Sequence, residues 1–310
     1  MPHSSAQAVQ LDDARRDDLC AAPSPLGPLP APASADDLAT HGLLEVTWSH
    51  GQSAVTRARA ASPLKLLVPR SKSEVARISI ATYGGGMLAG DETRLRVRLR
   101  PGAKAIVSTQ SSTKVFKSVD GRTTRQSLTA SLEPGAIGAF VPDPIACFAD
   151  ARYAQCQRFD VVGDATLLVL DWFTSGRRAR GEIWGFEHYS SRQQVFLDGH
   201  RIIEDAIRLD RSEGAIGGRF RGGRYHCQAL LMLVGQRTQA AVERLRELAG
   251  RQATHGAEAR RGLLVVANPV THGVLLRVAG EETEAVAQFI TGKIEPCLEL
   301  FDTSIWGRKF

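Results

Sequence analysis

Residues 78–117 decide the fold, and they read ISIATYGGGMLAGDETRLRVRLRPGAKAIVSTQSSTKVFK. Between Arg94 and Arg100, arginines alternate strictly with leucine and valine, which is the period-two pattern of a β-strand with one buried face. Pro101-Gly102 predicts a turn after this strand, and residues 105–107 predict that the chain then re-enters a sheet. The segment therefore predicts a strand, a glycine-rich turn, a second strand, a short turn and a third strand.

The glycine-rich turn invites a nucleotide-binding interpretation, because Gly84, Gly86 and Ala89 fit the pattern G-x-G-x-x-A. That motif requires a helix directly after the loop, whereas a strand is expected here. The loop also lacks the Lys-Ser or Lys-Thr pair that ends a phosphate-binding Walker A loop. Three adjacent glycines instead predict unusual dihedrals or a close approach of the backbone. We expect a tight β-connection in which Asp91 caps the turn or faces a polar interior.

Composition limits the class of protein and its partners. The 310 residues are 43% hydrophobic, which suffices for one large or two small domains with a core. The net charge of +6 allows an acidic partner, but the arginines are spread along strands and aromatic residues make up only 6%, so we expect no nucleic-acid partner. Five cysteines without a C-x-x-C pair favour a reducing compartment. No apolar run is long enough to cross a membrane, so we expect a cytoplasmic protein with no membrane partner.

The order of the elements predicts a mainly β protein. Residues 1–40 are rich in Ala, Pro, Ser and Asp, and we expect them to form a disordered tail. Residues 41–310 predict a single β-rich domain, because turn signals recur at the spacing of short strands and no internal repeat is evident. Helices are expected only late: one is capped by Thr238 and ends at Gly250, and one has Glu281-Glu282 in its first turn.

Acidic residues inside apolar or glycine-bounded β-segments are the most informative candidate functional residues. Each carboxylate must be hydrogen-bonded, paired with a cation, or in contact with internal water. One interpretation is that Asp143 caps a turn and that Asp171 and Glu182 pair with arginines of residues 177–180. The other is that several carboxylates line a hydrated internal path, whose oxygen atoms bind a divalent ion weakly enough to release it. The acids in question are Asp91, Asp143, Asp171, Glu182 and Glu187.

Enzymatic motifs are missing from the sequence. It contains neither the G-x-S-x-G motif of serine hydrolases nor the H-E-x-x-H motif of zinc proteases. The eight histidines are scattered, and no two share one element at the spacing of metal ligands. We therefore expect a protein that is not an enzyme.

Several segments resemble the urease accessory protein UreD family, also called UreH. The resemblance covers the chain from about residue 43 to its end and is most specific around DWFTSGRRARGE, residues 171–182. The matching segments are TYGGGMLAGD (82–91), VSTQSSTKVFKS (107–118), VPDPIACFADARYAQ (141–155), LLVLDWFTSGRRARGEIWGFEHYSS (167–191) and VLLRVAGEETEAVAQFI (274–290).

The resemblance implies a chaperone that matures urease and performs no catalysis. It implies an elongated, β-helix-like body of stacked β-sheets with a few α-helices toward the C-terminal side. The implied partners are UreF, the nickel-carrying GTPase UreG that UreF recruits, and apo-urease. No cofactor is expected to bind tightly, and Ni²⁺ is expected to pass in transit through a water-filled passage to the urease active site.

On that picture, the expected path residues are acids and neighbouring hydroxyls. They are Asp91, Asp143 and Glu182, with Thr82, Ser108 and Thr109 lining the path. A UreF contact on the C-terminal helical face would predict that a charge at Phe289 or Ile290 weakens binding. The alternative function is a β-rich interaction module that binds an anion or an acidic protein through its glycine loop and basic strand face, with no metal role.

Overall fold

The computed structural model describes residues 42–69, 73–254, 262–298 and 304–306. The chain divides into two units, Met1–Ala39 and Thr40–Phe310, and all described residues belong to the second. The disordered tail expected for residues 1–40 lies outside the described residues. None of the helices described is both long and apolar enough to cross a membrane.

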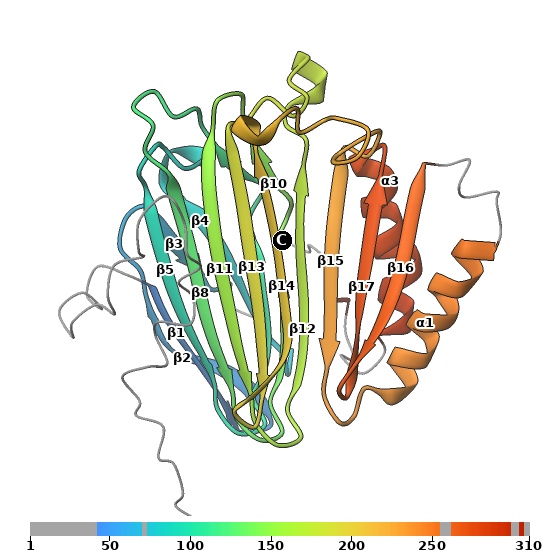
Figure 1. The fold of residues 1–310 in the computed structure, drawn as a ribbon. Helices are drawn as coiled ribbons and strands as arrows, with labels where there is room; N and C mark the ends of the chain where they lie inside the picture. The colour runs from blue at the N-terminus through green and yellow to red at the C-terminus, as the bar shows by residue number, and fades with distance from the viewer. Residues whose placement is uncertain (1–41, 70–72, 255–261, 299–303, 307–310) are drawn as a thin grey trace, which may run out of the picture. The chain divides into compact units, whose positions relative to one another are not determined.

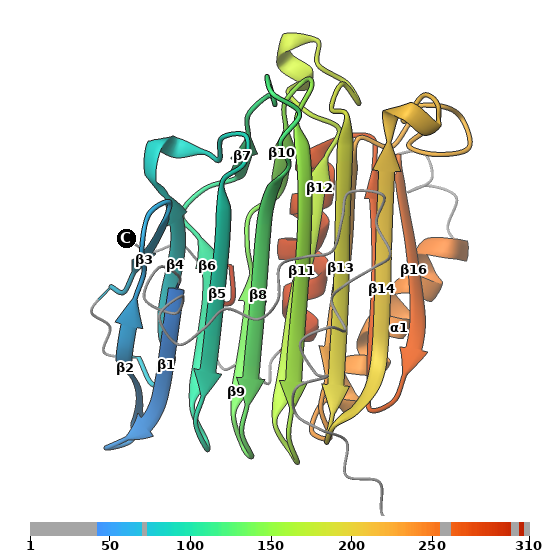
Figure 2. The same cartoon turned by 60° about the vertical axis from the view of Figure 1, so that its left-hand side comes forward.

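Two β-sheets make up most of the second unit (Figures 1 and 2). The first sheet contains, in spatial order, β14 (His200–Asp210), β13 (His188–Leu197), β11 (Arg152–Val161), β8 (Thr124–Leu132), β5 (Glu92–Leu99), β1 (Gly42–Ser49) and β2 (Gln52–Arg59). The second sheet contains, in order, β16 (Leu263–Val270), β17 (Gly273–Gly280), β15 (Cys227–Val234), β12 (Thr166–Thr174), β9 (Ile137–Val141), β6 (Lys104–Thr109), β4 (Ala76–Thr82) and β3 (Leu64–Leu67). Two short strands, β10 (Ile145–Cys147) and β7 (Thr113–Val115), extend the second sheet beside β12.

From β4 to β13 the chain winds as a coil between the two sheets. Successive long strands lie alternately in the second sheet and in the first. Within this part of the chain, neighbouring strands of the same sheet are therefore parallel, as in the pairs β5–β8, β8–β11 and β11–β13. This winding confirms the expected β-helix-like stacking. The predicted strand of alternating arginines is β5, in which Leu95, Val97 and Leu99 are buried.

Three tight turns of four residues each connect the first sheet to the second at one end of the coil, which we call the tight-turn end. They are residues 100–103, 133–136 and 162–165, and they contain glycines with φ of 70°, 75° and 60° at positions 102, 135 and 163. Each turn ends in a fully buried alanine: Ala103, Ala136 or Ala165. The turns recur in the fold but share little sequence, since they read RPGA, EPGA and VGDA.

Long connections gather at the other end, which we call the long-loop end. They are residues 83–91, 110–123, 142–151, 175–187 and 211–226. Both views show these loops at one end of the strands, opposite the tight turns (Figures 1 and 2). In the first of them Gly84 and Gly85 have φ of 75° and 73° and form a short 3₁₀ turn, and the loop leads into β5. A strand thus follows the glycines, as expected, and the helix of a nucleotide-binding loop is not formed.

The helices cover the outer face of the second sheet (Figure 1). The first, α1 (Gln239–Thr254), follows Thr238 as predicted but runs past Gly250, so the predicted end was wrong. The second, α3 (Thr283–Phe289), begins after Glu281-Glu282, with Glu282 as its N-cap, and continues into a π-helical turn, η7 (Ile290–Ile294). Short 3₁₀ turns are η4 (Tyr83–Gly85), η5 (Arg178–Arg180), η6 (Arg211–Glu213) and η8 (Glu295–Cys297).

The suggested partner contact on the C-terminal helices conflicts with burial. Phe289 and Ile290 are only 4% and 2% exposed and pack in the core between the helices and the second sheet. A charge at either position would disrupt that core before it could report on a partner.

Candidate functional site

Strand β12 separates two different interiors. Its even-numbered residues Leu168, Leu170 and Trp172 pack with α1 and α3. Its odd-numbered residues point toward the first sheet, where Leu167 and Val169 belong to the apolar core between the sheets. Asp171 occupies the next position of that face and is 7% exposed. The period of two therefore aims a carboxylate into the space between the sheets.

Three neutral side chains of the first sheet bond Asp171, and a fourth extends their network. Gln155 Nε2 donates a hydrogen bond to Asp171 Oδ1 at 2.7 Å. Ser191 Oγ and Gln193 Nε2 donate to Oδ2 at 2.8 and 2.9 Å. Gln157 Nε2 lies 3.4 Å from Gln155 Oε1 and extends the network along β11. We call Asp171 with these four residues the polar band.

The electrostatics of the polar band follow from its burial. Removal from water raises the pKa of the Asp171 carboxyl, and the hydrogen bonds from Ser191, Gln155 and Gln193 oppose that rise. The predicted pairing of Asp171 with an arginine was wrong, because the described side chains that bond it are an alcohol and two amides. Gln193 Oε1 is buried with no hydrogen-bond partner among the described residues, a position at which proteins usually hold an ordered water.

An aromatic cluster lies between the polar band and the long-loop end. The rings of Phe173 and Tyr189 stack with centroids 4.3 Å apart, and those of Tyr153 and Tyr189 are 5.8 Å apart. Tyr153 donates its hydroxyl hydrogen to Gln126 Oε1 at 2.9 Å, and burial raises the pKa of both tyrosines. Between the sheets the interior thus changes from aliphatic to polar to aromatic on approaching the long-loop end.

Two of the predicted path residues, Asp91 and Glu182, line one hollow of about 850 Å³ at the long-loop end. We call it the Asp91 hollow. Asp91 Oδ2 accepts a hydrogen bond from the Leu88 backbone N–H at 2.7 Å, so this residue caps its turn as predicted. The further charged residues of the lining are Lys117, Asp120, Arg122, Asp150 and Arg177.

Glu182 is held at the rim of this hollow by a cation. Its carboxylate forms an ion pair with Arg177 and accepts a hydrogen bond from the Ala149 backbone N–H at 3.2 Å. The hydrogen bond from Arg177 lowers the pKa of the Glu182 carboxyl. Arg177 in turn stacks on the Phe148 ring at 3.7 Å from its centroid. For Glu182 the structure thus bears out the interpretation of pairing with a nearby arginine.

The remaining predicted path residues lie on three adjacent strands of the second sheet or at their ends. Thr109 Oγ1 accepts a hydrogen bond from the Asp143 backbone N–H at 2.8 Å and lies 3.3 Å from Asp143 Oδ2. Thr109 lies two positions after the inward-facing Val107 on β6 and so points to the same side of the sheet. Thr82 lies four positions after the inward-facing Ile78 on β4 and also points inward. Ser108 lies on the opposite face, where its hydroxyl is 3.4 Å from that of Ser79. Thr109 and Asp143 are thus in contact, whereas Ser108 lies on the other side of the sheet.

The site offers oxygen and amide groups rather than a built metal centre. Among the described residues, no group of three or more His, Cys, Asp and Glu side chains is placed to hold a metal ion. Gln155, Gln157, Ser191 and Gln193 were missed in the sequence, although they occupy inward positions of strands whose other inward residues are apolar or aromatic. A polar residue in the buried register of a strand is the signal that would have found them.

Comparison with known proteins places the whole coil and its helices in one family. The family model for the UreD urease accessory protein matches residues 40–308. The urease accessory protein UreD of Sorangium cellulosum is 40% identical over 254 residues, which cover 82% of this chain and 78% of that protein. Urease accessory protein D of Oryza sativa subsp. japonica is 37% identical over 220 residues, 69% of this chain and 71% of the relative. That of Arabidopsis thaliana is 32% identical over 278 residues, 80% and 94% of the two chains. The chain belongs to the UreD family of urease accessory proteins.

Proposed function

We propose that this protein is a chaperone of urease maturation that binds a UreF homologue, through it the GTPase UreG, and apo-urease. In this role it conveys nickel to the urease active site and performs no catalytic step of its own. The accessory role follows from the family. The partners and the cargo are what the resemblance implies, and the interior of the coil supports the choice of cargo.

The observation that carries the nickel role is the polar band around Asp171. A carboxylate buried between two sheets is costly unless its charge is compensated. Here the described hydrogen bonds come from uncharged groups, so none of them compensates the charge of the ionised carboxylate, which a divalent cation could neutralise. Carboxylate, amide and hydroxyl oxygens form weaker nickel sites than thiolate or imidazole, which suits an ion that must be released.

The acids at the long-loop end suit an entry point for the same ion. Asp91 and Glu182 border the Asp91 hollow, and Asp143 with Thr109 lies at the same end of the second sheet. Glu182 is already neutralised by Arg177, so we expect its contribution to be smaller than that of Asp171. We therefore place the entry of nickel at the long-loop end and its passage along the polar band.

The nickel content of co-expressed urease tests this function. Asp171→Asn keeps the size of the side chain and removes its charge, and we expect it to lower nickel per urease by about tenfold, as loss of a group that orients metal does elsewhere. Asp143→Ala and Glu182→Ala should lower it less, with folding and complex formation mostly intact. Asp160→Asn is the matched control, because Asp160 lies on the same strand as Gln155 and pairs with Arg158 on the outer face.

Normal nickel loading with Asp171→Asn would contradict the nickel path. Loss of solubility or of complex formation in the Asp143 and Glu182 variants would assign those residues a structural role instead.

The alternative function is an anion- or protein-binding module without a metal role. It is favoured by one feature, the exposed arginines Arg96 and Arg98 on the outer face of β5. A pull-down with urease and a UreF homologue separates the two functions, since only the chaperone should associate with both.

A further inference from the structure

Phe220 is the most exposed large hydrophobic residue among those described. Its side chain is 95% exposed, at the tip of the loop formed by residues 211–226. A fully exposed phenylalanine contributes nothing to the core, while in a protein interface the same residue is a typical source of binding energy. The ring, which has the Arg219 guanidinium 5.8 Å from its centroid, is therefore available to a partner outside this chain.

The loop that carries Phe220 is held in shape by contacts that do not involve Phe220. Gly217 and Gly222 lie against the Trp184 indole so closely that a Cβ atom at either would be 2.7 or 2.6 Å from the ring. The Arg221 guanidinium donates hydrogen bonds to the backbone oxygens of Asp210 and Gly214 at 3.0 and 3.2 Å. The loop is thus preorganised, which reduces the entropy lost when a partner binds its tip.

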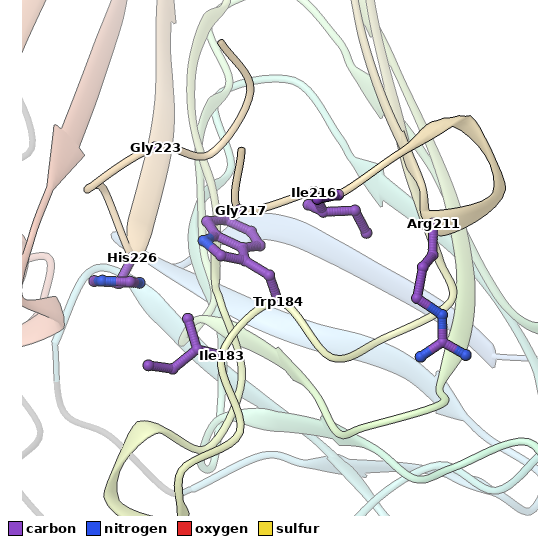
Figure 3. A pocket seen from close by; sticks show the side chains of 8 residues that line it. Ile183, Trp184, Arg211, Ile216, Gly217, Gly223 and His226 are labelled. Carbon is purple, nitrogen blue, oxygen red and sulfur yellow. The ribbon is translucent and has the colours of Figure 1, made fainter. Parts of the chain in front are cut away.

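A second hollow, of about 560 Å³, lies between this loop and residues 175–187 (Figure 3). We call it the Trp184 hollow. Ile183, Trp184 and Ile216 give its lining an apolar character, and Ile183 is 48% exposed. The lining suits a hydrophobic side chain of a partner, and Phe220 belongs to one of the two loops that form the hollow.

The two loops that form the Trp184 hollow contain seven arginines and three glutamates. Carboxylates from outside these loops, at Asp150, Glu281 and Glu282, pair with some of the arginines as well. Five of these arginines form ion pairs, namely Arg177, Arg178, Arg211, Arg221 and Arg224. Arg180 and Arg219 are exposed and have no ion-pair partner among the described residues. Such a surface is complementary to carboxylates.

We propose that Phe220 and the Trp184 hollow form a docking site for an acidic segment of a partner protein. A hydrophobic side chain of that segment fills the hollow, carboxylates on either side face Arg180 and Arg219, and Phe220 enters an apolar depression of the partner. The inference rests on the proposed function, since the partner is one of the urease-maturation proteins. It places that contact at the long-loop end and not on the C-terminal helices, where Phe289 and Ile290 are buried.

Binding of the full-length chain to two immobilised probes, the cognate UreF homologue and apo-urease, tests the docking site. Phe220→Ala and Arg219→Glu should each weaken binding to the same probe by about tenfold or more, as loss of an interface hot spot does. The defect of Arg219→Glu should shrink as salt is raised, because salt screens its repulsion of the carboxylates. Val162→Ala, at the tight-turn end, and Arg57→Glu, at an exposed position of the edge strand β2, are the matched controls and should bind as the wild type does.

The outcomes distinguish the docking site from the function on which it rests. If the wild type binds a probe and both variants bind it equally well, the docking site is wrong and the proposed function stands. If the wild type binds neither probe, the proposed function fails and the docking site falls with it. Two results would overturn the proposal, each with partner binding unchanged in the variants. Loss of binding to anionic lipid vesicles would assign Phe220 to a membrane, and loss of self-association would assign it to a second copy of the chain. Thermal melts check that the variants remain folded.

Discussion

The two ends of the coil are formed by the same strands but differ in how they connect them: short turns recur at the tight-turn end, and connections of varied length lie at the long-loop end. At the tight-turn end, residues 100–103 and 133–136 reverse the chain, and the Gly102 N–H bonds the Pro134 oxygen of the adjacent turn at 3.1 Å. At the long-loop end, the connections differ from one another in length and residues. Both described hollows and the exposed Phe220 belong to the long-loop end. Repetition at one end therefore supplies stability, and variety at the other supplies sites for function.

The interior shows the same contrast in side-chain chemistry. Leu167 and Val169 pack in the aliphatic core, whereas Asp171, two positions further along β12, is held by amides and a hydroxyl. An aliphatic interior needs no further explanation, since burial of apolar surface drives folding. A buried carboxylate lowers stability unless hydrogen bonds or a cation compensate it, so its presence next to the long-loop end fits a functional role for that end.

The largest expected difference between the two ends is in the stability lost when a glycine in a turn is replaced by valine. Both Gly135 and Gly85 have φ near 75°, where a β-branched side chain is strained. We expect Gly135→Val to lower the free energy of unfolding by about 3 kcal/mol and Gly85→Val by about 1 kcal/mol. The Gly135 backbone N–H donates a hydrogen bond to Asp164 Oδ1 at 2.6 Å, which holds this turn in place. A Cβ atom added at Gly85 would have no atom within 4 Å, so the loop around it can relax. Urea unfolding of both variants measures the difference.

Equal losses of stability in the two variants would show that the loop around Gly85 is as rigid as the tight turns. An unchanged melting temperature for Gly85→Val would show that this turn is not strained at all.

The pH dependence of stability tests whether Asp171 differs from the aliphatic residues on the same face of β12. Because folding raises the pKa of Asp171, the protonated form is favoured, and the associated stability is complete below the ordinary aspartate pKa and lost as pH rises through the folded value. In the Asp171→Asn variant the side chain at position 171 is uncharged at every pH. We therefore expect the free energy of unfolding of the wild type to fall relative to that of Asp171→Asn as the pH rises above the ordinary aspartate pKa and through the folded pKa.

Asp160→Asn is the control for this measurement, since Asp160 is an outer-face residue paired with Arg158. A constant difference between the wild type and Asp171→Asn across the pH range would mean that the carboxyl is not perturbed by its burial.

The smallest effect is expected at the rim of the Asp91 hollow. Folding lowers the pKa of Glu182, so its contribution to stability is present above the ordinary glutamate pKa and is lost as pH falls through the folded value. Glu182→Gln should therefore cause a slight loss of stability at neutral pH that disappears on acidification, as for a partly exposed ion pair. Thermal melts at pH 7 and at low pH test this, and a large loss at neutral pH would make Glu182 a structural residue of the fold.

The sequence predicted those features that depend on one strand or one turn. The alternation from Arg94 to Arg100 predicted β5, and the glycines before it predicted a turn that leads into a strand. Thr238 predicted the start of α1, but its end at Gly250 was wrong. A single glycine does not stop a helix whose neighbouring residues Leu245 and Ala249 are buried against a sheet.

The features that the sequence did not predict depend on strands brought together from distant segments. Asp171 was recognised as an unusual acid, but its partners Gln155 and Ser191 come from two other strands. Their meeting depends on the register of β11 with β13 and on which face of β12 opposes them, and neither is encoded in a local pattern. Nearby arginines in the chain suggested an ion pair, whereas the fold directs Asp171 inward and leaves Arg177 for Glu182.

The ladder of tight turns also bears on how this architecture tolerates changes of chain length. Adding one residue to 133–136 would put β9 out of step with its parallel neighbours β6 and β12 and exchange its inward for its outward side chains. An addition within 211–226 would be absorbed before β15 begins. Natural insertions and deletions should therefore accumulate at only one extremity of the strands, where the protein can acquire new binding specificity without disturbing its frame.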